Sequence, residues 1–407
     1  MTEGPYELPA GWRWVRLGEV LEKPQYGYTA SASENRDGPR FVRVTDLAGD
    51  GSIKWESVPH CVAADSVLQK YRLRLGDTLI ARSGSVGKTA LVDSLPEEAV
   101  FGSYLIRLRA EAALLPNYLI WFFQCPYYWE QVELRGSAQV NINAKMIQQF
   151  VMPLPPLSEQ RRIVAQVEAL MGRIQEGRRL RQQAKEETER LWQSILADAF
   201  PKPGAELPAG SRWVRLGEVF DIQQGVSMSP RRRAGQSPKP FLRTKNILWG
   251  SIDLSTVDEM DFSQEEAEKL RLRPGDLLVC EGGDVGRCAV WEGALPLVLY
   301  QNHIHRLRRT DAETDPHLVR YWMEAAYEVF GAYEGTESRT AIPNLSANRL
   351  KNFRFPLPPI IEQGRIVDRL HQAREHIDEL KAAQEETEAR LKTLEQSILD
   401  KAFRGKL

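Results

Sequence analysis

The stretch that decides the fold is residues 158–200, SEQRRIVAQVEALMGRIQEGRRLRQQAKEETERLWQSILADAF, which follows the run PLPP at 153–156 and contains no proline until Pro201. A set of positions in it alternates spacings of three and four, which is the seam pattern of a coiled coil. These positions are Val167, Leu170, Ile174, Gly177, Arg181, Ala184, Thr188, Leu191 and Ile195. The pattern predicts a helix of roughly 60 Å at ~1.5 Å per residue, and a helix of that length needs a partner along its seam.

A partner for this helix lies in the same chain. A second PLPP run at 356–359 leads into residues 362–403, and the sequence QSIL at 193–196 returns at 396–399. The second seam keeps a constant offset from the first, at Leu370, Ala373, Ile377, Leu380, Gln384, Thr387, Leu391, Leu394 and Ile398. The side chains expected to pair the helices are Val167, Leu170, Ile174, Leu191, Ile195, Ile377, Leu380, Leu391, Leu394 and Ile398. The chain therefore reads as a tandem duplication.

The globular segments before the two helices also repeat. Residues 7–20, ELPAGWRWVRLGEV, recur at 206–219 with a single change, and Trp14 and Val15 are expected in an edge strand followed by a short helix. Residues 73–88, LRLGDTLIARSGSVGK, recur at 272–287 as LRPGDLLVCEGGDVGR, which is typical of a turn, a buried strand and a Gly-rich loop that ends in a cation. Further strands are expected at 41–47, 106–109, 241–247 and 305–308, and aromatic-rich helices at 118–129 and 318–330. Each half is thus a mixed α/β (α+β) unit of short strands and a few helices.

The chain divides accordingly into four parts: 1–157, 158–200, 201–360 and 361–407. Ser158 is expected to cap the first long helix, and the run PKPG at 201–204 ends it and forms a short stiff linker. Residues 229–239, SPRRRAGQSPK, have no match in the first copy and are expected to form a mobile basic loop.

Bulk properties exclude several classes of protein. The chain of 407 residues has a net charge of −1, so any nucleic-acid surface must come from basic groups gathered on one face. The first residues, MTEGPYELPAGW, lack a basic and then apolar run, so we expect no secretory signal, and no apolar stretch is long enough to span a bilayer. The four cysteines, Cys61, Cys125, Cys280 and Cys288, lack metal-ligand spacing, so we expect free thiols in a reducing cytoplasm.

The Gly-rich loop suggests a nucleotide site only superficially. The run GSVGKT at 84–89 lacks the first glycine of a phosphate-binding loop, because Arg82 stands there, and the second copy lacks both the lysine and the hydroxyl. We interpret the loop as a tight turn that presents Lys88 and Arg287 to DNA or to solvent. His303 and His305 alternate on one strand without a nearby third metal ligand. Motifs for methyl transfer, nucleophilic catalysis or a zinc site are not found in the sequence.

Candidate DNA-contacting residues are polar and basic groups on strands and loops that match between the copies and on loops that differ between them. They are Arg43, Arg82, Ser83, Lys88, Gln139, Asn141, Arg231, Arg232, Arg233, Arg243, Lys245, Arg287 and Arg339. Each has a structural alternative: Arg43 stands near Asp46 and could be ion-paired, and the arginines at 231–233 could form a solvated loop.

This doubled order of motifs resembles the specificity subunit of type I restriction-modification systems. The residues that carry the resemblance are the PLPP-(Leu/Ile)-x-Glu-Gln runs at 153–160 and 356–363, the LGEV runs at 17–20 and 216–219, and the Gly-Asp pairs at 76–77 and 275–276. Together they cover essentially the whole chain. Ile361 departs from the first copy, where Ser158 stands at that place.

The resemblance implies a non-catalytic, cytoplasmic DNA-binding subunit. Each globular segment would be a target recognition domain that reads one half of a gapped two-part site on double-stranded DNA. The helices would form an antiparallel coiled coil, fix the spacer and dock two methyltransferase subunits, and translocase–nuclease subunits would join for restriction. No cofactor is expected on this chain, and S-adenosylmethionine, ATP and magnesium would belong to the partner subunits.

Two other hypotheses stay open on sequence alone. The chain could be a coiled-coil adaptor that assembles proteins without reading DNA, or a nucleotide-dependent enzyme that uses residues 84–89. Duplication of the scaffold together with divergence of the loops favours DNA recognition, since twofold symmetry in a protein matches two half-sites on a duplex.

Overall fold

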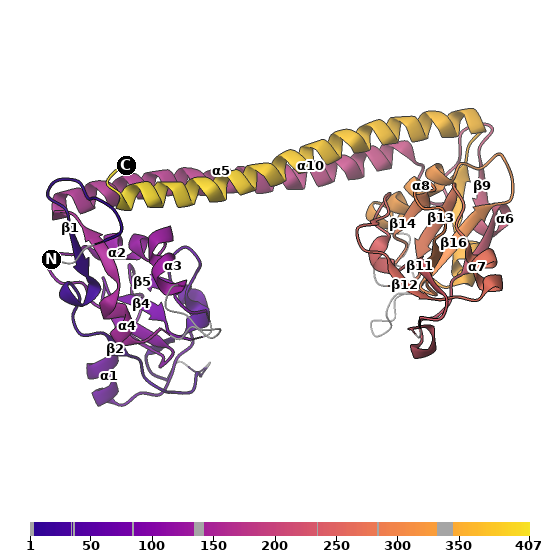
Figure 1. Cartoon of the computed structure of the whole chain (residues 1–407). Coiled ribbons are helices and arrows are strands. Elements are labelled where there is room, and N and C mark those ends of the chain that lie inside the picture. Colours follow the sequence, from indigo (N-terminus) through magenta and orange to yellow (C-terminus); the bar gives the residue numbers. More distant parts are fainter. Residues whose placement is uncertain are drawn as a thin grey trace. The chain divides into compact units, whose positions relative to one another are not determined.

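The computed structural model describes residues 4–33, 35, 37–83, 85–133, 142–233, 235–282, 285–331 and 345–407. The chain divides into two compact units: unit 1 comprises Met1–Arg181 with Glu385–Leu407, and unit 2 comprises Gln182–Gln384. The long helices α5 (Leu157–Ala199) and α10 (Ile360–Phe403) contribute residues to both units (Figure 1).

Unit 1 is built on a central sheet of four short strands in the order β2-β7-β4-β5. Two small sheets flank it, an antiparallel β1–β8 pair and a parallel β3–β6 pair. The strands are β1 (Arg13–Arg16), β2 (Gln25–Tyr26), β3 (Arg40–Val42), β4 (Thr78–Ala81), β5 (Thr89–Leu91), β6 (Ala99–Phe101), β7 (Leu105–Leu108) and β8 (Val151–Leu154). The short helices are α1 (Asp65–Tyr71), α2 (Pro116–Phe122), α3 (Pro126–Glu133) and α4 (Ala144–Gln149).

Unit 2 repeats this arrangement and adds one strand, β12. Its central sheet has the order β10-β16-β13-β14, β9 pairs with β17, and β11 pairs in parallel with β15 and on its other edge with β12. The strands are β9 (Arg212–Arg215), β10 (Phe220–Gln224), β11 (Pro238–Leu242), β12 (Asp258–Asp261), β13 (Asp276–Cys280), β14 (Cys288–Trp291), β15 (Leu299–Tyr300), β16 (Ile304–Arg309) and β17 (Arg354–Leu357). The short helices are α6 (Leu216–Val219), α7 (Gln264–Leu270), α8 (Pro316–Glu328) and α9 (Ala347–Asn352). The tandem duplication and the mixed α/β class are confirmed.

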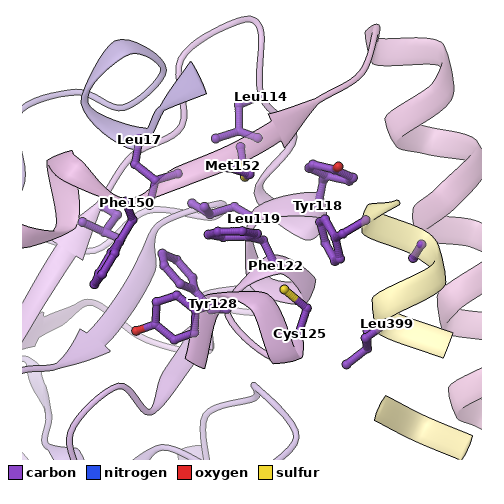
Figure 2. Packing of buried hydrophobic residues seen from close by; sticks show 14 of the residues in the cluster. Leu17, Leu114, Tyr118, Leu119, Phe122, Cys125, Tyr128, Phe150, Met152 and Leu399 are labelled. Atoms are coloured by element: carbon purple, nitrogen blue, oxygen red, sulfur yellow. The ribbon is translucent and has the colours of Figure 1, made fainter. Parts of the chain in front are cut away.

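The strands β4 and β5 of unit 1 and β13 and β14 of unit 2 are buried on both faces because they are apolar at consecutive positions. In β4, Ile80 faces the cluster formed with α2, α3 and the long helices, whereas Leu79 and Ala81 face the cluster on the opposite side. Figure 2 shows the first cluster, in which the rings of α2 and α3 gather with Leu399 of α10. Both clusters recur in unit 2, where Leu277 and Leu278 face opposite sides in the same way. This packing holds the short strands rigidly enough to position the loops at their ends.

The repeated Gly-Asp pair is an internal ion-pair site. Asp77 is 1% exposed, accepts from the backbone N–H of Arg74 at 2.9 Å and accepts from Nε of Arg109 at 2.6 Å. In unit 2, Asp276 accepts from the backbone N–H of Arg273 and from Nε of Arg308, each at 2.7 Å. These hydrogen bonds tie the turn before the buried strand to the neighbouring strand and raise the pKa of Arg109.

The repeated Glu-Gln pair explains how each long helix is anchored. Gln160 is fully buried: its Oε1 accepts from the N–H of Leu115, and its Nε2 donates to the carbonyls of Ala113 and Pro155. Gln363 makes the equivalent three hydrogen bonds, with Asp315, Glu313 and Pro358. One amide therefore fixes the start of each long helix to the loop before α2 or α8.

Some local predictions are wrong. Only the first part of 41–47 and of 241–247 is strand, and a 3₁₀ turn follows in each copy, at Val44–Asp46 and at Thr244–Asn246. The side chain of Asp46 accepts a hydrogen bond from the N–H of Arg43 and closes the first turn. Asn246 accepts from the N–H of Arg243 in the same way and closes the second. The segment 118–129 is two helices because Pro126 starts a new one. α5 begins at Leu157, so Ser158 lies inside the first turn and does not cap the helix.

The long helices pack in opposite directions within each unit. In unit 1, Arg178 of α5 pairs with Glu395 of α10 at 2.6 Å, while Arg181 pairs with Glu388 at 2.6 Å. In unit 2, Nε2 of Gln384 donates to Oγ1 of Thr188 at 3.1 Å. Ile174 and Ile398 share the core of unit 1, and Ile377 lies in the core of unit 2.

The stripe of buried and partly buried residues on α10 differs from the predicted seam at alternate positions, whereas α5 departs from its seam at Leu191. On α10 it runs through Gln363, Val367, Leu370, Arg374, Ile377, Lys381, Gln384, Glu388, Leu391, Glu395, Ile398 and Ala402. The predicted burial of Leu380 and Leu394 is wrong, since they are 47% and 49% exposed. Leu191 is likewise 49% exposed, and its neighbour Trp192 is buried instead.

The stripe departs from the predicted seam because charged residues occupy its alternate positions. Glu388 and Glu395 lie there with their carboxylates paired to arginines of α5, and a long charged side chain can bury its stem while its head stays paired. A pattern that counts only apolar residues selects the adjacent leucines instead. Of the other predicted pairing residues, Val167 is buried, and Leu170, Ile195 and Leu391 are partly buried against the cores of their units.

All four cysteines are buried and free, as predicted. Burial raises the pKa of the Cys125 thiol to about 12. Across the described part of the chain, no helix is both long and apolar enough to cross a membrane, and no cluster of metal-ligating side chains is found there.

Candidate nucleic-acid interface

The Gly-rich loops are the tight turns that join two buried strands of each central sheet. The N–H of Gly87 donates to the carbonyl of Ala81 at 3.0 Å, and the N–H of Gly286 donates to Cys280 at 3.0 Å. Gly87 has a φ of +81°, and a Cβ there would lie 2.7 Å from the ring of Trp129. A side chain at this position would therefore be strained by the backbone conformation and would also collide with the Trp129 ring. Its N–H is used within the turn, which disfavours a nucleotide phosphate as its partner.

The cations at the ends of these loops lie in different surroundings. Lys88 lines a groove of about 460 Å³ in unit 1, together with Trp129 and, from α10, Lys392 and Gln396. Arg287 donates from Nη2 to the carbonyl of Thr244 at 2.8 Å, so it holds the loop of unit 2 against the neighbouring 3₁₀ turn. The predicted DNA contacts of Lys88 and Arg287 stay predictions.

The strand arginines are paired with carboxylates. Arg43 makes a two-pronged contact with Asp46 at 2.9 and 3.0 Å, which raises the pKa of Arg43. Arg243 and Lys245 both contact Asp258, at 2.9 and 3.4 Å, and lower the pKa of that carboxyl. The three side chains are between 39% and 45% exposed, so each keeps a face toward solvent.

The basic segment unique to unit 2 is anchored. Pro230–Arg233 forms a 3₁₀ turn, and Arg232 donates to both carboxylate oxygens of Glu266 at 2.9 and 2.6 Å. The Arg232 guanidinium, together with the N–H of Ser263, lowers the pKa of Glu266 to about 2. Arg232 thus fastens the turn to α7. The side chains of Arg231 and Arg233, and the candidates Gln139, Asn141 and Arg339, lie outside the described residues.

The remaining candidates, Arg82 and Ser83, follow β4 at the edge of the Gly-rich loop. The Arg82 guanidinium lies 5.0 Å from the centre of the Tyr26 ring, a cation–π contact. Both residues are partly exposed, and Tyr104, whose carbonyl accepts from the N–H of Arg82, is 66% exposed. The sequence analysis missed Tyr26 and Tyr104, although both stand at ends of strands where the two copies differ.

The structure therefore does not unite the predicted residues into one patch. In unit 2, Arg243, Lys245 and Arg287 gather around the 3₁₀ turn Thr244–Asn246. In unit 1, Arg82 lies with Tyr26, and Arg43 lies with Asp46. Lys88 lines a separate groove beside α10.

Comparison with known proteins matches both halves of the chain to one family. The model of the type I restriction modification DNA specificity domain matches residues 9–185 and again residues 208–389. The chain belongs to this family. Each match begins at the first strand of one α/β unit and continues into the long helix that follows it.

Other members of the specificity-domain family match most of the chain. The specificity subunit of type I restriction enzyme EcoKI from Escherichia coli is 25% identical over 85% of this chain and 78% of its own length. The specificity subunit of the StySPI enzyme from Salmonella potsdam is 24% identical over the same shares of the two chains.

Two solved structures agree with the family assignment over the full length. The HsdS subunit from Thermoanaerobacter tengcongensis has 33% identity, covers 100% of both chains and gives a TM-score of 0.62. A chain from a study of complex assembly and conformational transition of the type I R-M system has 32% identity, covers 99% of this chain and 100% of its own, and gives a TM-score of 0.81.

Proposed function

We propose that this chain is the DNA-specificity subunit of a type I restriction-modification complex, and that each α/β unit reads one half of a gapped two-part DNA site. The observation that carries the proposal is the duplication of the specificity domain, in which hydrogen-bond register is repeated while surface loops diverge. A protein with two related reading units matches two half-sites on one duplex. Different loops on equivalent scaffolds favour half-sites of different sequence.

The long helices are proposed to form one antiparallel coiled coil that sets the spacer between the half-sites and docks two methyltransferase subunits. Support comes from the opposite directions of α5 and α10 within each unit and from the stripe of alternating three- and four-residue spacings. Exposed leucines beside that stripe, Leu191, Leu380 and Leu394, offer apolar surface to such partners.

Chemistry is assigned to the partner subunits. No cluster of metal-ligating side chains is found among the described residues, and the N–H groups of Gly87 and Lys88 donate to carbonyls within the Gly-rich turn. The methyltransferase subunits would hold S-adenosylmethionine, and the translocase–nuclease subunits would use ATP and magnesium. The complex is proposed to act in the cytoplasm, where the four buried thiols stay reduced.

A selection experiment separates this proposal from a coiled-coil adaptor that does not read DNA. The chain is purified with its methyltransferase subunits and incubated with sheared genomic DNA, and the retained fragments are sequenced. Enrichment of a gapped two-part motif is the expected result. An intact complex that retains fragments without any shared motif would favour the adaptor.

A further inference from the structure

One surface position has the same backbone in both units and opposite chemistry. The N–H of Arg82 donates to the carbonyl of Tyr104 at 3.0 Å, and its own carbonyl accepts from Ile142 at 3.2 Å. In unit 2, the N–H of Glu281 donates to His303 at 2.9 Å, and its carbonyl accepts from Leu345 at 2.9 Å. A guanidinium in unit 1 is therefore replaced by a carboxylate in unit 2.

The side chains around this position change with it. Arg82 lies over the ring of Tyr26 in β2, opposite Ile106 of β7. At the same register of unit 2, Gln224 of β10 lies opposite His305 of β16, and its Nε2 donates to Glu281 at 2.9 Å. Cationic and aromatic surface in unit 1 thus corresponds to acidic and amide surface in unit 2.

Fold maintenance does not account for this exchange. The buried ion pairs behind the same strands keep their residue types in both copies, Asp77 with Arg109 and Asp276 with Arg308. Arg43, Arg232 and Arg243 are each paired with a carboxylate. Among the described residues, by contrast, no carboxylate pairs with the Arg82 guanidinium, which lies over the Tyr26 ring, and the neighbouring Tyr104 is 66% exposed.

The unit 2 side chains are held in position for recognition. The Glu281 carboxylate is 12% exposed and lies between Gln224 and two imidazoles, 3.8 Å from Nδ1 of His303 and 4.0 Å from Nε2 of the buried His305. Burial lowers the pKa of His305, so this imidazole is neutral at pH 7. The contacts with Gln224 and the imidazoles therefore hold the carboxylate in one orientation, and His303 beside it is 59% exposed.

We propose that this position is a base-reading position in both units, where Arg82 donates to the acceptors of guanine and Glu281 accepts from the exocyclic amino group of cytosine or adenine in the major groove. Arginine suits the paired O6 and N7 acceptors of guanine, and a carboxylate suits an amino donor. The inference rests on the proposed function and specifies which residues make the two half-sites differ.

The test is methylation of a randomised DNA library by the complete complex, followed by sequencing of the methylated molecules. Arg82→Ala should relax one guanine-containing position of one half-site by about five- to 150-fold and leave the other half-site unchanged. Glu281→Gln should relax one position of the other half-site, and the relaxed base distinguishes cytosine from adenine. Arg72→Ala and Glu268→Gln, which alter exposed residues elsewhere in units 1 and 2, should leave both half-sites unchanged.

The contradicting outcomes are distinct from one another. Unchanged base preferences in both variants, or an equal loss of methylation on all sequences as expected for phosphate contacts, would overturn the inference. A wild-type complex that methylates without a two-part motif would instead contradict the proposed function. If a variant fails to assemble into the complex, Arg82→Lys or Glu281→Asp replaces it in the same methylation test. The same outcomes then support or overturn the inference, because each substitution keeps the charge and alters the hydrogen-bonding geometry.

Discussion

Two buried glutamines anchor the long helices to the α/β units. Gln160 and Gln363 each make three hydrogen bonds to backbone groups, at the place where a long helix joins an α/β unit. Buried polar groups that lose their partners destabilise a protein by about 1–3 kcal/mol each. The glutamine of the repeated Glu-Gln pair therefore has the same structural role in both copies of this chain.

Gln160→Leu is expected to lower the free energy of unfolding by at least about 2 kcal/mol, because it leaves the N–H of Leu115 and two carbonyls without their partner. Gln175→Leu, on the exposed surface of the same helix, is the matched control and should change stability by less than about 0.5 kcal/mol. Urea unfolding of both variants measures the difference. Equal effects would contradict the anchoring role of Gln160.

The Arg232–Glu266 pair makes the stability of unit 2 depend on pH. The pKa of Glu266 falls from its ordinary value of about 4.5 to about 2 in the folded chain, so the pair stabilises the fold above pH 4.5. This stabilisation is lost as the pH falls toward 2, because the folded state then has to take up the proton that the unfolded state already carries.

Glu266→Gln should therefore be less stable than the wild type at pH 7, and the difference should shrink as the pH falls from about 5 toward 2. Thermal unfolding midpoints of both proteins at a series of pH values test this. Glu268→Gln on the exposed side of the same helix serves as the control. A difference that stays constant over this range would refute the linkage.

Residue types alone indicated which side chains matter but not what they contact. Arg43 and Arg243 are predicted DNA contacts in matching strands and Arg232 in the segment unique to the second copy, and the structure pairs each with a carboxylate. The partners of Arg232 and Arg243 lie 34 and 15 residues away, so only the folded strand arrangement brings them together. Glu281 was missed because an acidic side chain was not considered as a reader of DNA.

At the scale of elements, the long helices were predictable and their packing stripe was only half predictable. Length, the absence of proline and apolar spacing indicated α5 and α10 because these features are local. The alternate positions of the stripe are partly exposed charged residues such as Glu388 and Glu395, which pair with arginines far away in the sequence. Hydrophobicity could not reveal them.

The revised stripe makes a direct prediction for α10. Ile377→Ala should destabilise unit 2 by about 2–4 kcal/mol, since Ile377 is 1% exposed within the core. Leu380→Ala should lower the free energy of unfolding by no more than about 1 kcal/mol, because the Leu380 side chain is already 47% exposed. Urea unfolding followed by tryptophan fluorescence compares them. A similar loss of unfolding free energy in both variants would contradict the revised stripe and support the seam predicted from the sequence.

At the scale of the whole molecule, the duplication was the most informative feature of the sequence. Repeated runs such as LGEV and Gly-Asp predicted two related units, and strand pairing repeats from one unit to the other. Strand order was not predictable, because pairings such as β2 with β7 join residues that are 82 positions apart in the sequence. The loops that would read DNA gave the weakest signal, since their geometry depends on the entire scaffold.

If the paired helices set the spacer, lengthening them should change the target and keep both half-sites. Four residues inserted near Gln182 add about 6 Å of helix, and at ~3.4 Å per base step the spacer should grow by one or two base pairs. The same insertion after Gly204, in the linker, should leave the spacer unchanged. Methylation motifs of the two constructed variants provide the measurement, and an unchanged spacer in a folded first variant would exclude the ruler.

The most direct test of the central claim is a genome-wide map of methylated adenines in the host, with and without the gene for this chain. The account predicts a gapped two-part motif that is methylated in the wild type, disappears on deletion and returns when the gene is restored. A map that is methylated at such motifs and does not change on deletion would contradict the claim that this chain determines the DNA sequence recognised.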